Sequence, residues 1–201
     1  MTIGNLNVND VSGSDIRNIF CYIIPNWIYS VNLSYNFRTV ISLTRRKLEQ
    51  RKALIVKPQR KLNYIITTNQ KGTTILNYLI YLKARNIVTP IYTEPVLLSI
   101  NDSLLGRTSL LVNNISYYFN LNNYTNYIVL IDKRKTLDTE VLTIDSLTAD
   151  TINITSPVTQ NFIGNTTIIY PLFSCYLSNK DFKDITDTMT KIELEFTEYV
   201  E

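Results

Sequence analysis

Apolar and polar residues alternate strictly in two segments, one near each end of the chain. Residues 31–37 read VNLSYNF and residues 192–196 read IELEF, so every second side chain is apolar. This period of two predicts half-buried β-strands, and Glu193 and Glu195 give the second strand an acidic outer face. Both strands need partners, and one economical arrangement joins the two chain ends in one sheet with a β module inserted between them.

The segment that follows the first alternating strand has a less regular pattern. Residues 39–43 are predicted to extend that strand, and residues 44–53 to form a short helix or a charged loop. Residues 53–56 and 62–67 flank Pro58, which cannot donate a hydrogen bond to a β ladder. We therefore expect an antiparallel connection there, with Pro58 at a turn or an edge.

One stretch has the apolar period of a helix, and we expect a single packed helix over about residues 72–86. Its apolar residues at helical spacing are Ile75, Leu76, Leu79, Ile80 and Leu82. Lys83 and Arg85 would lie in the last turn, where cations are favoured by the helix dipole.

From about residue 95 onward the pattern changes to short β segments separated by turn residues. The predicted strands cover residues 96–100, 109–112, 127–132, 140–144, 151–155 and 167–172. Residues 145–150 are a predicted hairpin connection, and the short spacing of the strands is typical of a small barrel or sandwich.

Composition supports a folded, β-rich chain. Of its 201 residues 45% are apolar, which suits one large domain, or one domain with a smaller insertion. Residues 1–15 are polar and read as a flexible arm without the features of a signal peptide. No apolar run is long enough for a transmembrane helix, so we expect no membrane partner and synthesis in the cytoplasm.

Residue types exclude several kinds of chemistry. The chain has no histidine, which rules out histidine triads, histidine bases and histidine metal ligands. Cys21 and Cys175 cannot form a zinc site and are interpreted as buried thiols rather than a disulfide. The acidic residues read as solvated loop carboxylates; they are Asp132, Asp138, Glu140, Asp145, Asp181, Asp184 and Asp187. We therefore predict no catalytic, cofactor or metal site and no enzyme activity.

A cluster of cations is the most unusual feature of the sequence, because the net charge of the whole chain is only +3. Its eight basic residues are Arg45, Arg46, Lys47, Arg51, Lys52, Lys57, Arg60 and Lys61, with Glu49 as the single acid. Three readings stay open: a nucleic-acid grip, a solvated charge run, or a surface for assembly. The acidic end of the chain, with Glu193, Glu195, Glu198 and Glu201, offers a complementary surface on the next copy of a ring.

The order of several short motifs resembles a module of tailed-phage structural proteins. Pro25-Asn-Trp27 precedes a strand, and Thr39 lies in the next strand segment. Then come Glu49-Gln50-Arg51, Pro58-x-Arg60, Leu82-Lys83-Ala84-Arg85, the β module around residues 126–154, Ile169-Tyr170-Pro171-Leu172 and the terminal IELEF. This order is similar to that of the distal-tail and minor-tail proteins of phages and gene transfer agents.

The resemblance implies a mainly β (α+β) fold: a β-sandwich built from both chain ends, one packed helix and an inserted, barrel-like β module. Its domains would be an N-terminal arm at residues 1–15, the first part of the sandwich at 16–95, the insertion at 96–168, and the terminal strands at 169–201.

The resemblance also implies a structural protein of the virion tail with no catalytic role. It would form a homo-oligomeric ring, expected to be sixfold, at the distal end of the tail. The ring would join the tail tube to the tail hub and to receptor-binding or fibre proteins, with DNA passing through its lumen. The candidate interface or lumen residues are Arg45, Arg46, Lys47, Glu49, Arg51, Lys52, Arg60, Lys61, Glu193 and Glu195.

Three alternatives remain. A tail completion, head–tail connector or baseplate wedge protein would belong to the same class. A nucleic-acid-binding module would use residues 45–61, and its affinity would fall steeply with salt. A tail-associated hydrolase is the third and weakest, because no histidine and no convincing carboxylate pair is present.

Overall fold

The computed structural model describes most of the second half of the chain and separate stretches of the first. The described residues are 19–20, 23, 25, 28–37, 39–43, 49–53, 59–68, 80, 87–113, 115, 126–134, 138–186 and 189–199. Within them the structure is mainly β, and every strand pair with a described register is antiparallel except β1 (Ile19–Phe20) with β6 (Ile87–Pro90), which is parallel. The chain divides into two compact units.

Unit 1 comprises Met1–Ile24 and Asn86–Ser174, and unit 2 comprises Pro25–Arg85 and Cys175–Glu201. The longest strand, β12 (Thr167–Thr186), contributes its first part to unit 1 and its second part to unit 2. The unit boundaries lie near residues 85 and 174, whereas the predicted insertion spanned residues 96–168. The difference arises because β6 and the turn after it pair with β1 and β12, and the amide of Ile91 donates to the carbonyl of Pro171.

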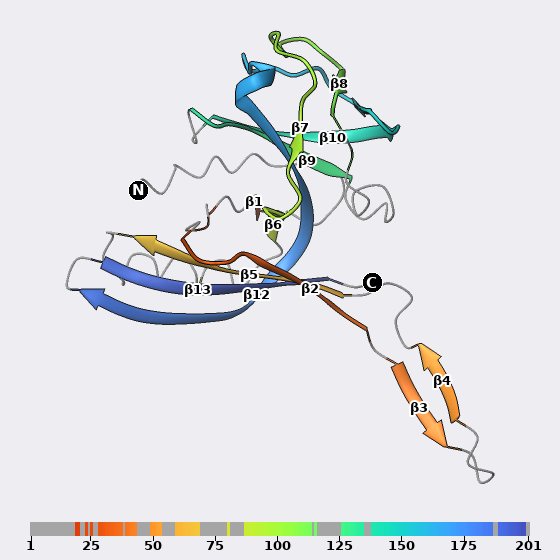
Figure 1. Cartoon of the computed structure of the whole chain (residues 1–201), viewed down its shortest axis with the longest axis vertical. Coiled ribbons are helices and arrows are strands. Elements are labelled where there is room, and N and C mark those ends of the chain that lie inside the picture. Colours follow the sequence, from red (N-terminus) through yellow and green to blue (C-terminus); the bar gives the residue numbers. More distant parts are fainter. Residues whose placement is uncertain are drawn as a thin grey trace. The chain divides into compact units, whose positions relative to one another are not determined.

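Unit 2 holds a sheet made of strands that precede and follow the Asn86–Ser174 segment of unit 1. Its strands are β2 (Asn32–Asn36), β5 (Gln59–Thr68), β13 (Met189–Glu198) and the second part of β12, in that spatial order. Figure 1 shows β13 between β5 and β12. The two alternating segments of the sequence are therefore strands of one sheet, and both pair with β5.

Alternation sets which residues of this sheet are buried. Ile192, Leu194 and Phe196 on β13 are fully buried, and so is Leu62 on β5, while Glu193 is exposed. The rings of Tyr64 and Phe196 stack across the ladder with centroids 5.7 Å apart. Apolar burial on one face therefore fixes the register, because a shift by one residue would turn every apolar side chain to the other face.

Residues 39–53 differ from the prediction. Strand β3 (Thr39–Leu43) does not extend β2 but pairs with β4 (Glu49–Ala53) in a separate two-stranded sheet. The helix or loop predicted over residues 44–53 is wrong for 49–53, and residues 44–48 lie outside the described part of the chain. The prediction failed because β4 consists mostly of charged and polar residues and has no alternation of apolar residues that would indicate a strand. Its strand conformation depends on pairing with β3.

The helix predicted over residues 72–86 is not borne out. Of that range the structure describes only Ile80, which has helical conformation; the remaining residues lie outside the described part. The other helical element among the described residues is the 3-10 turn η1 (Gly164–Thr166).

Unit 1 contains a run of paired strands that returns to its starting point. Beyond β12 its strands are β7 (Val96–Leu97), β8 (Ser109–Leu111), β9 (Tyr127–Asp132), β10 (Thr139–Leu147) and β11 (Thr151–Ile154). The pairings follow the order β7, β12, β9, β10, β11, β8. A bridge between Leu98 and Val112, immediately after β7 and β8, then joins the last strand to the first.

The interior of unit 1 is an apolar cluster contributed by these strands and the loops between them. Its fully buried members include Leu104, Leu110, Ile128, Leu130, Ile152 and Ile169. The predicted strands at 127–132 and 151–155 match β9 and β11 closely. Strand β9 is a short, continuous apolar run that is buried on both faces, whereas β11 alternates apolar and polar residues. Strand β10 runs on to Leu147, so the predicted connection at 145–150 shrinks to residues 148–150.

Gly164 is the first residue of the 3-10 turn η1 in unit 1, where the backbone packs closely against a neighbouring loop. Its amide donates to the carbonyl of Asp102, and a Cβ added at Gly164 would overlap the carbonyl oxygen of Ile100. Gly106 is different: it has a φ of 77° and open space around its Cα. One glycine is therefore required by contact with the backbone, and the other by its backbone conformation.

We predict that Gly164→Ala destabilises the protein by roughly 1–3 kcal/mol, because the loop carrying Ile100 must move. Gly106→Asn is the matched control, since asparagine tolerates a positive φ and no atom lies within 4 Å of a Cβ added there. Urea unfolding followed by circular dichroism measures both. Equal stability of Gly164→Ala and the wild type would contradict the close approach.

Candidate assembly site

The structure divides the ten candidate interface residues into three groups. Arg45, Arg46 and Lys47 lie outside the described residues. Glu49, Arg51 and Lys52 belong to β4, where the ladder places them opposite Leu43, Ile41 and Val40 of β3. Arg60, Lys61, Glu193 and Glu195 lie on β5 and β13 of the unit 2 sheet, and their side chains are described.

Arg60 is held inside the sheet of unit 2. Its residue is only 5% exposed, and its Nη2 donates to Oε1 of Glu198 at 2.6 Å. Both the Nε and the backbone amide of Arg60 donate to Oε2 of the same carboxylate at 3.0 Å. Glu198 is thus bound through both oxygens, a geometry that the planar guanidinium favours.

The neighbouring residue reinforces this contact from the backbone side. The Nε2 of Gln59 donates to the carbonyl oxygen of Glu198 at 2.9 Å. Beside it the rings of Tyr176 and Tyr199 lie 5.1 Å apart, and burial, then the nearby Cys175 and Tyr176, raise the pKa of the Tyr199 hydroxyl. The end of β13 is thus contacted by both neighbouring strands, by β5 through Gln59 and by β12 through Tyr176.

A second, more solvated pair lies on the polar face of the same sheet. Nζ of Lys61 lies 3.4 Å from Oε1 of Glu195, and both side chains are partly exposed. The same oxygen accepts from Oγ of Ser178 at 2.6 Å, and Thr197 Oγ1 donates to that serine at 2.8 Å. Ser178 lies at an irregularity in the β12–β13 register, between Leu177 and Asn179, which sets its side chain toward Glu195.

These contacts revise the electrostatic prediction. The basic segment and the acidic end are complementary, but Arg60 and Lys61 meet Glu198 and Glu195 of the same chain rather than of a neighbour. Glu193 stays exposed, as predicted for the outer face of β13. Two of the eight cations in the nucleic-acid interpretation are thus engaged within unit 2, which weakens that interpretation.

Glu198 was not among the predicted site residues, although the sequence contained a signal for it. Arg60 continues the apolar phase of Leu62 and Tyr64, and Glu198 continues that of Leu194 and Phe196. When two neighbouring strands each carry a charged residue among the side chains of the buried face, the two charges are expected to form a buried ion pair. Which strands are neighbours is known only from the tertiary structure.

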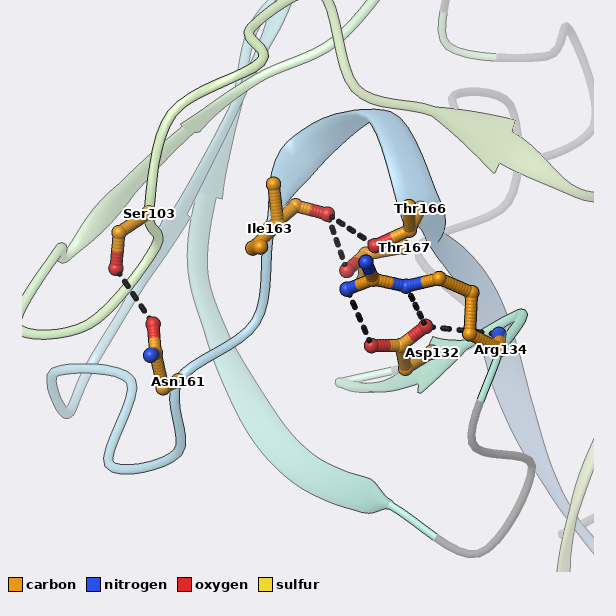
Figure 2. A network of polar contacts seen from close by, with 7 residues as sticks. All are labelled: Ser103, Asp132, Arg134, Asn161, Ile163, Thr166 and Thr167. Carbon is orange, nitrogen blue, oxygen red and sulfur yellow. Dashed lines mark hydrogen bonds and ion pairs between the residues drawn. The ribbon is translucent and has the colours of Figure 1, made fainter.

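Two carboxylates of unit 1 are also structural. Asp132 is buried and accepts from the amide, Nε and Nη2 of Arg134, as Figure 2 shows. Glu140 is buried and accepts from the amide and hydroxyl of Thr159 and from the amide of Gln160. The prediction of solvated loop acids is therefore wrong for both, because each carboxylate binds backbone amides of a turn or loop.

Other polar contacts in Figure 2 hold the loops around η1. The hydroxyls of Thr166 and Thr167 both donate to the carbonyl of Ile163, and the side chains of Ser103 and Asn161 are hydrogen-bonded. Asp181 and Asp184 were predicted in a loop but lie in β12, while Asp187 lies outside the described part.

Among the described residues, no group of three or more acidic or cysteine side chains is placed to hold a metal ion. Cys175 is fully buried in β12, and Cys21 lies outside the described residues. No helix in the described part of the chain has the length and apolar character needed to cross a membrane. No family model matches the sequence, and no curated protein matches it significantly.

We predict that Arg60→Leu destabilises unit 2 by roughly 3–5 kcal/mol, because Glu198 would be left buried without its cation. The double variant Arg60→Leu/Glu198→Leu is expected to recover most of this loss, since it removes both charges. Thermal and urea unfolding measure the difference between single and double variants.

Lys61→Ala is the control for charge removal on the same strand. Its partly solvated pair with Glu195 should contribute about 1 kcal/mol or less. If Arg60→Leu costs no more stability than Lys61→Ala, the buried pair does not stabilise the sheet.

Proposed function

We propose that this chain is a structural protein of a phage tail, forming a ring at the distal end of the tail. The observation that carries the proposal is the two-unit organisation: one β sheet combines strands that precede and follow the β segment Asn86–Ser174. The motif order of the sequence implies the same organisation. The sheet of unit 2 would be one layer of the β-sandwich, and the cyclic strand order of unit 1 would be the small barrel-like module.

Polar residues of the described chain support a role in assembly rather than in chemistry. Arg60, Asp132 and Glu140 are buried, and each is bound to groups of its own unit that keep a strand end or loop in place. Such groups give a subunit rigid surfaces, as a ring requires. The ring, expected to be a hexamer, would contact the tail tube, the hub and receptor-binding or fibre proteins, and DNA would pass through its lumen.

Strand β4 is the proposed source of charged ring contacts. Its sequence Glu49-Gln50-Arg51-Lys52-Ala53 pairs only with β3 among the described strands. A two-stranded ribbon is marginally stable by itself, so contact with a neighbour would stabilise it. The cations of β4 would set the register and choice of that neighbour more than the affinity.

We expect the full chain to assemble into closed rings, measured by mass photometry and by cryo-electron microscopy of purified particles. A chain that stays monomeric at micromolar concentration and is missing from every virion would refute the proposal. A tail completion, connector or baseplate wedge protein would also be found in particles, but at a different position along the tail.

The charge-reversal variant Arg51→Glu/Lys52→Glu should reduce ring formation at least tenfold and leave the thermal transition unchanged. Lys133→Glu, an exposed change in unit 1, is the control and should assemble normally. If the β4 variant loses its thermal transition instead, the residues act within the subunit. If duplex DNA binds the wild type tightly and with a steep salt dependence that this variant abolishes, the nucleic-acid alternative is favoured.

A further inference from the structure

Strand β2 lies at one end of the unit 2 sheet. Among the described strands it pairs only with β5, with Leu33 opposite Leu62 and Asn32 opposite Asn63. Proteins usually protect such edges with charges, prolines or bulges, because an open strand recruits other strands. Residues 28–37 read IYSVNLSYNF and contain no charged residue and no proline. Within residues 28–37 the strand therefore carries no charge or proline that would block pairing with another strand.

Apolar burial decreases sharply at the same edge. Leu62 on β5 is fully buried, whereas Leu33 beside it on β2 is only partly buried. At either end of the segment Ile28 is 85% exposed and Phe37 is 74% exposed. These two are the most exposed large apolar residues in the described part of the chain, which indicates a contact surface rather than a solvated edge.

We propose that β2 pairs with β2 of a second copy of this chain, antiparallel and about a two-fold axis at Ser34. In this register Leu33 lies opposite Tyr35 of the second copy, and Val31 opposite Phe37. Asn32 lies opposite Asn36, and Ser34 opposite itself. Apolar residues thus meet apolar residues on one face, and polar residues meet polar residues on the other.

The order of polar and apolar residues in β2 indicates that the strand pairing with it belongs to a second copy of the chain. The alternation of Asn32-Leu33-Ser34-Tyr35-Asn36 reads as polar and apolar in the same order from either end, so the surface is self-complementary under a two-fold axis. Residues 28–37 carry no charge that would oppose self-association or recruit an acidic or basic partner. Of the described cations that face this segment, Lys61 is paired with Glu195 and Arg60 with Glu198, while Lys191 Nζ lies 4.1 Å from the ring centroid of Tyr29.

This contact is independent of the proposed tail function. A two-fold contact uses the same surface on both copies and is complete in a dimer, whereas a ring joins two different surfaces. The β2 contact would therefore link two free subunits, or subunits of two separate rings.

Cysteine cross-linking tests the register. Ser34→Cys should form an interchain disulfide under mild oxidation, because directly opposed residues of an antiparallel pair lie about 4.5–5.5 Å apart. Asn32→Cys and Asn36→Cys should not cross-link alone, since each would lie about four residues, or roughly 13 Å, from its own copy. A mixture of Asn32→Cys and Asn36→Cys should cross-link. The wild type is the control for the native cysteines.

Ser34→Lys tests the association itself. The position is exposed, so folding should be unchanged, but two lysines would face one another at the axis. Sedimentation velocity of the full chain should show the dimer dissociation constant raised at least tenfold, with an unchanged thermal transition. Ser99→Lys, at an exposed serine of unit 1, is the matched control.

Three outcomes would overturn the proposal: no self-association of the wild type at tens of micromolar, cross-linking of Asn32→Cys alone as efficient as that of Ser34→Cys, or a Ser34→Lys protein that still dimerises normally. Ring formation that persists in Ser34→Lys would support the tail function even if the β2 contact fails. Loss of rings in the β4 variant would leave the β2 result unaffected.

Discussion

The antiparallel ladder between β5 and β13 is the contact on which unit 2 depends. It joins residues 59–68 to residues 189–198, and at its end Arg60 and Glu198 bind each other across 138 residues of sequence. Leu62, Leu194 and Phe196 are fully buried along it, so apolar burial and the ion pair specify the same register. Without this ladder β2 would have no sheet to join, because its described pairing is with β5.

This ladder also explains why the Asn86–Ser174 segment of unit 1 is an insertion. Because β5 and β13 are neighbours in space, everything between them in sequence must leave the sheet and return to it. The return strand is β12, whose first part completes the pairings of unit 1 and whose second part adds to the unit 2 sheet. Contacts so distant in sequence carry a loop-closure penalty, so unit 1, with its own apolar cluster, is expected to form before the ladder closes.

Several buried carboxylates near strand ends are bound by groups of their own unit. Glu140 binds two backbone amides, Asp132 binds Arg134, and Glu198 binds three donors of Arg60. Burying such groups is tolerated only when their hydrogen bonds are satisfied. The two surfaces proposed for partners are the charged strand β4 and the uncharged edge β2. They differ in chemistry: one would select a neighbour by charge, and the other would take a strand of matching alternation.

The sequence by itself determined the strands whose apolar residues alternate, such as β2, β11 and β13, because the side chains of a strand point to opposite faces in turn. It suggested one sheet built from both chain ends as an economical arrangement, and the pairing of β2 and β13 with β5 decided it. It did not reveal β4, which has no apolar alternation, or the extension of β12 beyond residue 172 through charged residues. The tertiary structure decided the fate of Arg60, Lys61, Asp132 and Glu140, because whether a charge is solvated or paired depends on which strand lies beside it. Local pattern fixes the face on which a side chain lies, and only the fold supplies its partner.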